Sequence, residues 1–88
     1  MKIKSGFVLE KIGNGYLAVA LGERAKDFSG LVRMNETGAF LWNKMTEADL
    51  TREQLLSAIT AEYDIDEQTA LADIDKFVQK LSENGIID

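Results

Sequence analysis

Two apolar runs near the start of the chain predict a β-hairpin. Phe7 to Ile12 and Tyr16 to Leu21 are rich in residues that favour strands, and Gly13-Asn14-Gly15 separates them. Because Asn14 and Gly15 tolerate positive φ angles, we expect them to form the tight turn between the two strands.

The second of these strands is apolar on both faces. Alternation places Leu17, Val19 and Leu21 on one face, and Tyr16, Ala18 and Ala20 lie on the other. We expect the face with the larger aliphatic side chains to be buried and the other face to be only partly covered.

A third strand is expected soon after the hairpin. The polar stretch 22–29 is interpreted as a loop, Gly30 as a turn, and Leu31 to Met34 as a short strand. Its outer edge is expected to remain unpaired.

From Asn35 onward the apolar spacing becomes helical. Asn35 is expected to cap a first helix that ends within 46–50, and Thr51-Arg52-Glu53-Gln54 is a capping box that opens a second helix to about Tyr63. Asp66 caps a third helix, which Asn84-Gly85 ends. The apolar positions of the first two helices are Ala39, Phe40, Trp42, Met45, Leu55, Leu56 and Ile59, and those of the third are Ala70, Leu71, Ile74, Phe77, Val78 and Leu81.

These elements predict one α+β domain over residues 1–88, with a three-stranded antiparallel sheet followed by three helices. The tight connection at Asp64-Ile65 suits a helix-turn-helix corner, so the order indicates a winged helix-turn-helix. Nothing along the chain suggests a linker or a second domain.

The composition argues against an enzyme. The 88 residues include no Cys and no His, so the commonest nucleophile, base and zinc ligands are absent. The acidic cluster 62–67 invites a calcium-loop reading, but counting from Asp64 the sixth position is Thr69 rather than glycine and the twelfth is Asp75 rather than glutamate. We expect no cofactor, no metal, no membrane segment and a cytoplasmic location.

Charge is divided unevenly along the chain. Residues 1–44 hold seven Lys and Arg against four Asp and Glu, whereas residues 45–88 hold three against eleven, giving about +3 and −8. Solubility alone explains acidic helices, but a basic docking edge on the strand-bearing half is also compatible with this pattern.

The winged helix-turn-helix fold makes a DNA-binding transcription regulator the alternative function. Its recognition helix, 66–84, would carry five acidic residues against Lys76 and Lys80, a net charge of −3. Because phosphate contacts need cations, we expect no nucleic-acid partner.

The unpaired third strand offers another use, because exposed strand edges bind peptides by strand addition. About four backbone hydrogen bonds along Leu31 to Met34 would contribute roughly 2 to 6 kcal/mol. Micromolar affinity requires about 8 kcal/mol, so apolar side chains of the peptide would also have to enter a pocket. The same edge could pair with its own copy, so both a monomer and a weak edge-mediated dimer are open.

Several segments carry a resemblance to a known family. The longest is Asn35-Glu36-Thr37-Gly38-Ala39-Phe40-Leu41-Trp42, and Gly6-Phe7-Val8-Leu9 and Asp27-Phe28-Ser29-Gly30 precede it. The third helix adds Asp73-Ile74, Phe77-Val78, Leu81 and Gly85-Ile86. In this order and spacing, the chain resembles the PqqD-like family of peptide-recognition domains (RiPP recognition elements).

That resemblance implies a non-catalytic chaperone of peptide modification. Its partners would be the leader segment of a ribosomally made precursor peptide and a modifying enzyme, often a radical S-adenosylmethionine protein, as in the synthesis of pyrroloquinoline quinone (PQQ). The leader would add as a strand between the third strand and the third helix. The residues implied by position are Leu31, Val32, Arg33, Met34, Asp73, Phe77 and Lys80.

Overall fold

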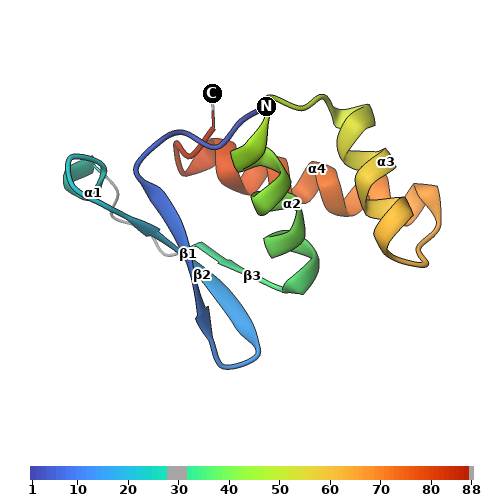
Figure 1. Cartoon of the computed structure of the whole chain (residues 1–88), viewed down its shortest axis with the longest axis horizontal. Coiled ribbons are helices and arrows are strands. Elements are labelled where there is room, and N and C mark those ends of the chain that lie inside the picture. The colour runs from blue at the N-terminus through green and yellow to red at the C-terminus, as the bar shows by residue number, and fades with distance from the viewer. Residues whose placement is uncertain (28–31, 88) are drawn as a thin grey trace.

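The computed structural model describes residues 1–27 and 32–87, and its strands form one antiparallel sheet in the order β1-β2-β3 (Figure 1). The strands are β1 (Phe7–Ile12), β2 (Gly15–Ala20) and β3 (Val32–Met34). The expected hairpin and third strand are confirmed, except that Leu31 lies outside the described residues. Among the described residues β3 pairs only with β2, so its other side is an edge of the described sheet.

The hairpin turn differs from the expected one in its backbone angles. Gly13 has a φ of +59°, whereas no non-glycine residue among those described, Asn14 included, has a positive φ. Ile12 pairs with Gly15, so Gly13 and Asn14 form the two-residue loop. A positive φ at the first loop position is typical of a type II′ turn, in which glycine is preferred at that position.

A short helix that the sequence did not predict interrupts the loop between β2 and β3. It is α1 (Arg24–Asp27), and it lies beside the hairpin end remote from the turn (Figure 1). The Arg24 guanidinium donates through Nε to the Ser5 carbonyl (3.0 Å) and lies over the Phe7 ring. A helix of four residues has no apolar periodicity, so pattern reasoning had no signal for it.

The three expected helices are present as α2 (Glu36–Glu47), α3 (Arg52–Glu62) and α4 (Glu67–Glu83). Asn35 accepts from the Gly38 amide (2.9 Å) and caps α2, and Asp66 accepts from the Thr69 amide (2.8 Å) and caps α4. Both predicted caps are confirmed. They could be predicted because a cap depends on hydrogen bonds between residues close in the sequence.

The core lies where the helices pack against one face of the sheet. α2 contacts β2 and β3, and α3 packs against both α2 and α4. Val32, Trp42, Ile74 and Leu81 are among the buried side chains, and Ile86 folds back into the core after α4.

The prediction for the faces of β2 was wrong. Ala18 is 2% exposed and faces the core, whereas Leu21 is 51% exposed and Leu17 and Val19 are half-buried. The small side chain of Ala18 lets the helices approach the sheet closely, so the helices pack against the face of β2 that carries the smaller side chain. Side-chain volume alone pointed to the opposite face.

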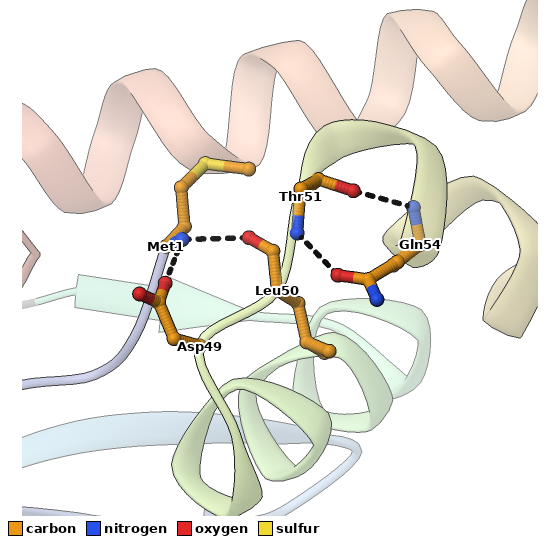
Figure 2. Close-up of polar contacts among 5 residues, drawn as sticks. All are labelled: Met1, Asp49, Leu50, Thr51 and Gln54. Carbon is orange, nitrogen blue, oxygen red and sulfur yellow. Dashed lines mark hydrogen bonds and ion pairs between the residues drawn. The ribbon is translucent and has the colours of Figure 1, made fainter.

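The N-terminal residue is held against the connection between α2 and α3 (Figure 2). The Met1 ammonium donates to Asp49 Oδ1 (2.5 Å) and to the Leu50 carbonyl (2.6 Å), and the Leu50 amide donates back to the Met1 carbonyl (2.9 Å). The predicted capping box follows directly, with Thr51 Oγ1 accepting from the Gln54 amide and Gln54 Oε1 accepting from the Thr51 amide. These contacts fix the direction in which the chain enters α3.

Three carboxylates with lowered pKa values predict a loss of stability in acid. The Met1 ammonium lowers the pKa of Asp49, the Thr69 amide and hydroxyl lower that of Asp66, and the Arg52 guanidinium lowers that of Asp75. A carboxyl group whose pKa is lower in the folded protein than in the unfolded chain stabilises the fold at pH values above its unfolded pKa, which is near 3.8. That contribution is lost as the pH falls from there through the folded pKa.

We therefore expect the thermal unfolding midpoint to fall as the pH is lowered from 5 to about 2.5. Asp75→Asn should be less stable at neutral pH and should show a shallower acid slope, because it no longer titrates. The measurement is thermal unfolding of both proteins by circular dichroism across this range. If the unfolding midpoints of the two proteins fell equally steeply with pH, Asp75 would not contribute to the loss of stability in acid.

Candidate functional site

The backbone of β3 presents one residue, Arg33, to the open side of the sheet. The Leu21 amide donates to the Gly6 carbonyl (2.8 Å), so the backbone groups of Leu21 point toward β1. In an antiparallel sheet these directions alternate, so Ala18 and Tyr16 point toward β3, where they pair with Val32 and Met34. The N–H and C=O of Arg33 therefore point away from β2.

A side-chain contact agrees with this direction. Lys80, in the last turn of α4, donates from Nζ to the Arg33 carbonyl at 2.6 Å. The outward carbonyl of β3 is thus already hydrogen-bonded to α4. The structure shows no partner for the outward N–H of Arg33 among the described residues.

A groove of about 550 Å³ lies alongside this edge. Its apolar lining comes from three elements: Met34 of β3, Gly38 and Leu41 of α2, and Phe77 of α4. Asn14 and Gly15 of the hairpin turn also line it. An apolar groove next to an unpaired strand edge can accept an extended chain whose backbone pairs with the edge while a side chain enters the groove.

The charged residues that line the groove are mostly basic. Among the described residues, Arg33, Lys76 and Lys80 line it together with one acidic residue, Asp73, which gives a local charge of +2. Within residues 1–27 and 32–87, neither Lys76 nor Asp73 forms an ion pair. Since the whole chain carries −5, the rest of the molecule carries −7, and the groove is a basic strip on an acidic protein.

Five of the seven predicted site residues meet in this groove: Arg33, Met34, Asp73, Phe77 and Lys80. Val32 does not, because its side chain is fully buried beneath the sheet. Leu31 lies outside the described residues. Whether the five residues bind a peptide stays a prediction.

Sequence reasoning missed Gly38, Leu41 and Lys76. Lys76 shares a helical face with Asp73, Phe77 and Lys80 at spacings of three and four, so that signal was available. Leu41 and Gly38 were assigned to the start of a helix, and their position in the groove depends on how α2 packs against β3.

The acidic cluster around the α3–α4 connection has a structural role. Asp66 caps α4 through the Thr69 amide and also accepts from the Thr69 hydroxyl (2.9 Å). In the described part of the chain, no three acidic side chains gather in a way that could hold a metal ion. Nor does any described helix combine the length and apolar character needed to cross a membrane.

Alanine at position 38 is expected to destabilise the protein, whereas most glycine-to-alanine changes inside a helix stabilise it. An alanine Cβ at this position would lie 2.9 Å from Met34 Cβ and 3.4 Å from Phe77 Cε1. Met34 Cβ is attached to the backbone and cannot rotate away. A glycine-to-alanine change inside a helix normally stabilises by about 1 kcal/mol, but overpacking here costs about 1 to 3 kcal/mol.

We expect Gly38→Ala to lower the free energy of unfolding by up to about 2 kcal/mol and to narrow the groove. Asn43→Ala is the control, because Asn43 is exposed on the same helix and reports helix propensity without a clash. Urea unfolding of both variants measures the difference. A stabilised Gly38→Ala protein would show that α2 can move away from β3.

Comparison with known proteins places the chain in a family. The family model described as coenzyme PQQ synthesis protein D (PqqD) matches residues 18–87, which include β3, α2 and α4. The solved structure of TbiB1 in complex with the TbiA(beta) leader peptide has a TM-score of 0.72 and 23% sequence identity, over 100% of this chain and 95% of that chain. A search of curated proteins gave no match. The shared fold confirms the predicted arrangement of a three-stranded sheet followed by helices, and because the family model spans most of the chain, this protein belongs to the PqqD family.

Proposed function

We propose that this protein is a non-catalytic adaptor that binds the leader segment of a ribosomally made precursor peptide. The leader adds as a strand along β3 and lies in the groove between β3 and α4. The observation that carries this proposal is the outward-facing backbone of Arg33 beside an apolar groove. Membership of the PqqD family and a shared fold with TbiB1, which was solved with a leader peptide, support it.

The energetics require both the edge and the groove. Two hydrogen bonds to the Arg33 backbone contribute about 1 to 3 kcal/mol. Burying one large apolar side chain of the leader against Phe77 and Leu41 adds about 1.5 to 3 kcal/mol. Since micromolar affinity needs about 8 kcal/mol, we expect several leader residues beyond these contacts to take part.

The adaptor acts by raising the local concentration of its substrate. A leader held in the groove keeps the attached core peptide near a modifying enzyme, which we propose to be a radical S-adenosylmethionine protein. A short flexible linker gives an effective concentration in the millimolar range. Specificity then comes from leader recognition, and the chemistry is supplied by the partner.

The test is a binding titration of the full chain with the labelled leader of the short peptide encoded beside its gene. We expect saturable binding in the micromolar range by fluorescence anisotropy. A core peptide from the same precursor, without the leader, is the control and should not bind. Absence of leader binding by the folded protein would overturn the proposal.

The same titration with duplex DNA examines the alternative of a transcription regulator. α4 with its cap carries five acidic residues against two lysines, and both lysines line the groove. A DNA complex would weaken steeply as salt rises, whereas a strand-addition complex with an apolar anchor should weaken far less. Specific, salt-sensitive duplex binding would favour the regulator.

A further inference from the structure

Lys80 occupies the hydrogen-bond acceptor that an added strand would need. Its ammonium lies 2.6 Å from the Arg33 carbonyl, which points to the open edge of β3. A leader that pairs with Arg33 would present an N–H to this same carbonyl. In the free protein, therefore, the edge is partly closed by the protein's own side chain.

Moving Lys80 away from this carbonyl has a cost unless the ammonium finds a new partner. A charge-assisted hydrogen bond is worth more than a neutral one, and a carboxylate is the strongest acceptor that a peptide can supply. Lys80 is exposed on a long flexible stem, so a short movement of its ammonium needs no change in the backbone.

The surroundings favour the same ligand chemistry. Lys76 and Arg33 line the groove with Lys80, and Asp73, the carboxylate found there among the described residues, pairs with none of them. These cations raise the local potential over a distance of about 8 Å at physiological salt. Asp75, the nearby carboxylate on the same helix, is engaged with Arg52 instead (2.7 Å).

We propose that the groove selects leaders that carry an acidic residue beside their apolar anchor, and that this carboxylate draws Lys80 off the Arg33 carbonyl. The inference rests on the proposed function and adds the chemistry of the ligand. The carboxylate takes the ammonium, the freed carbonyl accepts the leader N–H, and the strand pairs with Arg33. Lys80 is thus a specificity-determining residue that disfavours neutral leaders.

The experiment compares two leaders with three proteins. The leaders are the one encoded beside the gene and a copy in which Glu and Asp are replaced by Gln and Asn. The proteins are the unaltered chain, Lys80→Met, and Lys26→Met as the matched control. Met keeps most of the lysine stem, and Lys26 lies on α1 with Glu23 as its partner, outside the groove.

We expect the unaltered protein and Lys26→Met to bind the acidic leader about threefold to tenfold more tightly than the neutral copy, with the difference shrinking in high salt. Lys80→Met should lose this preference. It should also bind the neutral copy more tightly than the unaltered protein does, because the Arg33 carbonyl is no longer occupied. A merely structural role for Lys80 would weaken both leaders equally.

Two results would overturn the inference while leaving the proposed function intact. One is equal binding of the two leaders by the unaltered protein, and the other is that the leader encoded beside the gene binds although it carries no Asp or Glu. If neither leader binds any of the folded proteins, the proposed function itself fails.

Discussion

Replacing Arg33 by proline is expected to weaken leader binding about tenfold to a hundredfold while leaving the fold intact. Proline removes the outward N–H of β3, and its ring occupies the position that the leader backbone would take. The loss of two hydrogen bonds, about 1 to 3 kcal/mol, sets this range. The measurement is leader titration by anisotropy, with circular dichroism as the folding check.

The fold should tolerate this proline for two reasons. Arg33 is exposed, and its N–H does not bond to β2, which is the situation in which edge strands accept proline. The preceding residue, Val32, is already extended in β3, as proline requires.

Arg33→Gln is the matched control, because it removes the same charge and keeps the N–H. If a folded Arg33→Pro protein bound the leader as well as Arg33→Gln, strand addition at β3 would be wrong. Proline at Val32, the more obvious choice from sequence, is a poor test. The Val32 N–H faces β2 and its side chain is fully buried, so that variant would disrupt the sheet itself.

Replacing Phe77 by alanine is expected to cost about 3 to 5 kcal/mol of folding free energy. The ring is only 8% exposed and packs in the core, and it also lines the groove. Small domains have about 5 to 15 kcal/mol of stability in total, so this variant could be largely unfolded. Urea unfolding followed by tryptophan fluorescence of Trp42 measures the loss.

Phe77→Leu separates the two roles of this side chain. It keeps most of the apolar volume, so we expect a smaller loss of stability, about 1 kcal/mol, and a folded protein. Leader binding should still weaken, because the groove loses the flat ring against which an apolar anchor would pack. Unchanged leader binding by a folded Phe77→Leu protein would show that Phe77 serves only the core.

The sequence predicted the elements well where their signals are local. The Asn35 cap, the Thr51 capping box and the Asp66 cap each depend on side-chain hydrogen bonds within three residues, and all are present. The hairpin was also predicted, although the positive φ lies at Gly13 rather than at Asn14 or Gly15. The turn residues could be recognised, but their exact roles in the turn depend on the strand register.

Features that depend on packing between distant segments were not predictable in this way. The buried face of β2 was assigned wrongly, because both faces are apolar and only the position of α2 decides between them. The contact between Lys80 and the Arg33 carbonyl joins residues 47 apart. The family resemblance placed both residues at the site, but the hydrogen bond between them could not be inferred from spacing.

The candidate site shows the same division. Phe77, Asp73 and Lys80 could be placed on one face of α4 from their spacing, and Lys76 follows the same rule. Gly38 could not, because its close approach to Met34 exists only after α2 has packed onto β3. The sequence therefore predicted the groove residues on α4 better than those on α2.

Strand addition at β3 is tested by an amide-resolved NMR titration of the labelled full chain with the leader peptide. We expect saturable shifts at Arg33 and Met34 on β3 and at Asp73, Lys76, Phe77 and Lys80 on α4, with slowed hydrogen exchange at the Arg33 amide. Shifts confined to the outer edge of β1 or to the α3–α4 connection, with the Arg33 amide unchanged, would contradict the account.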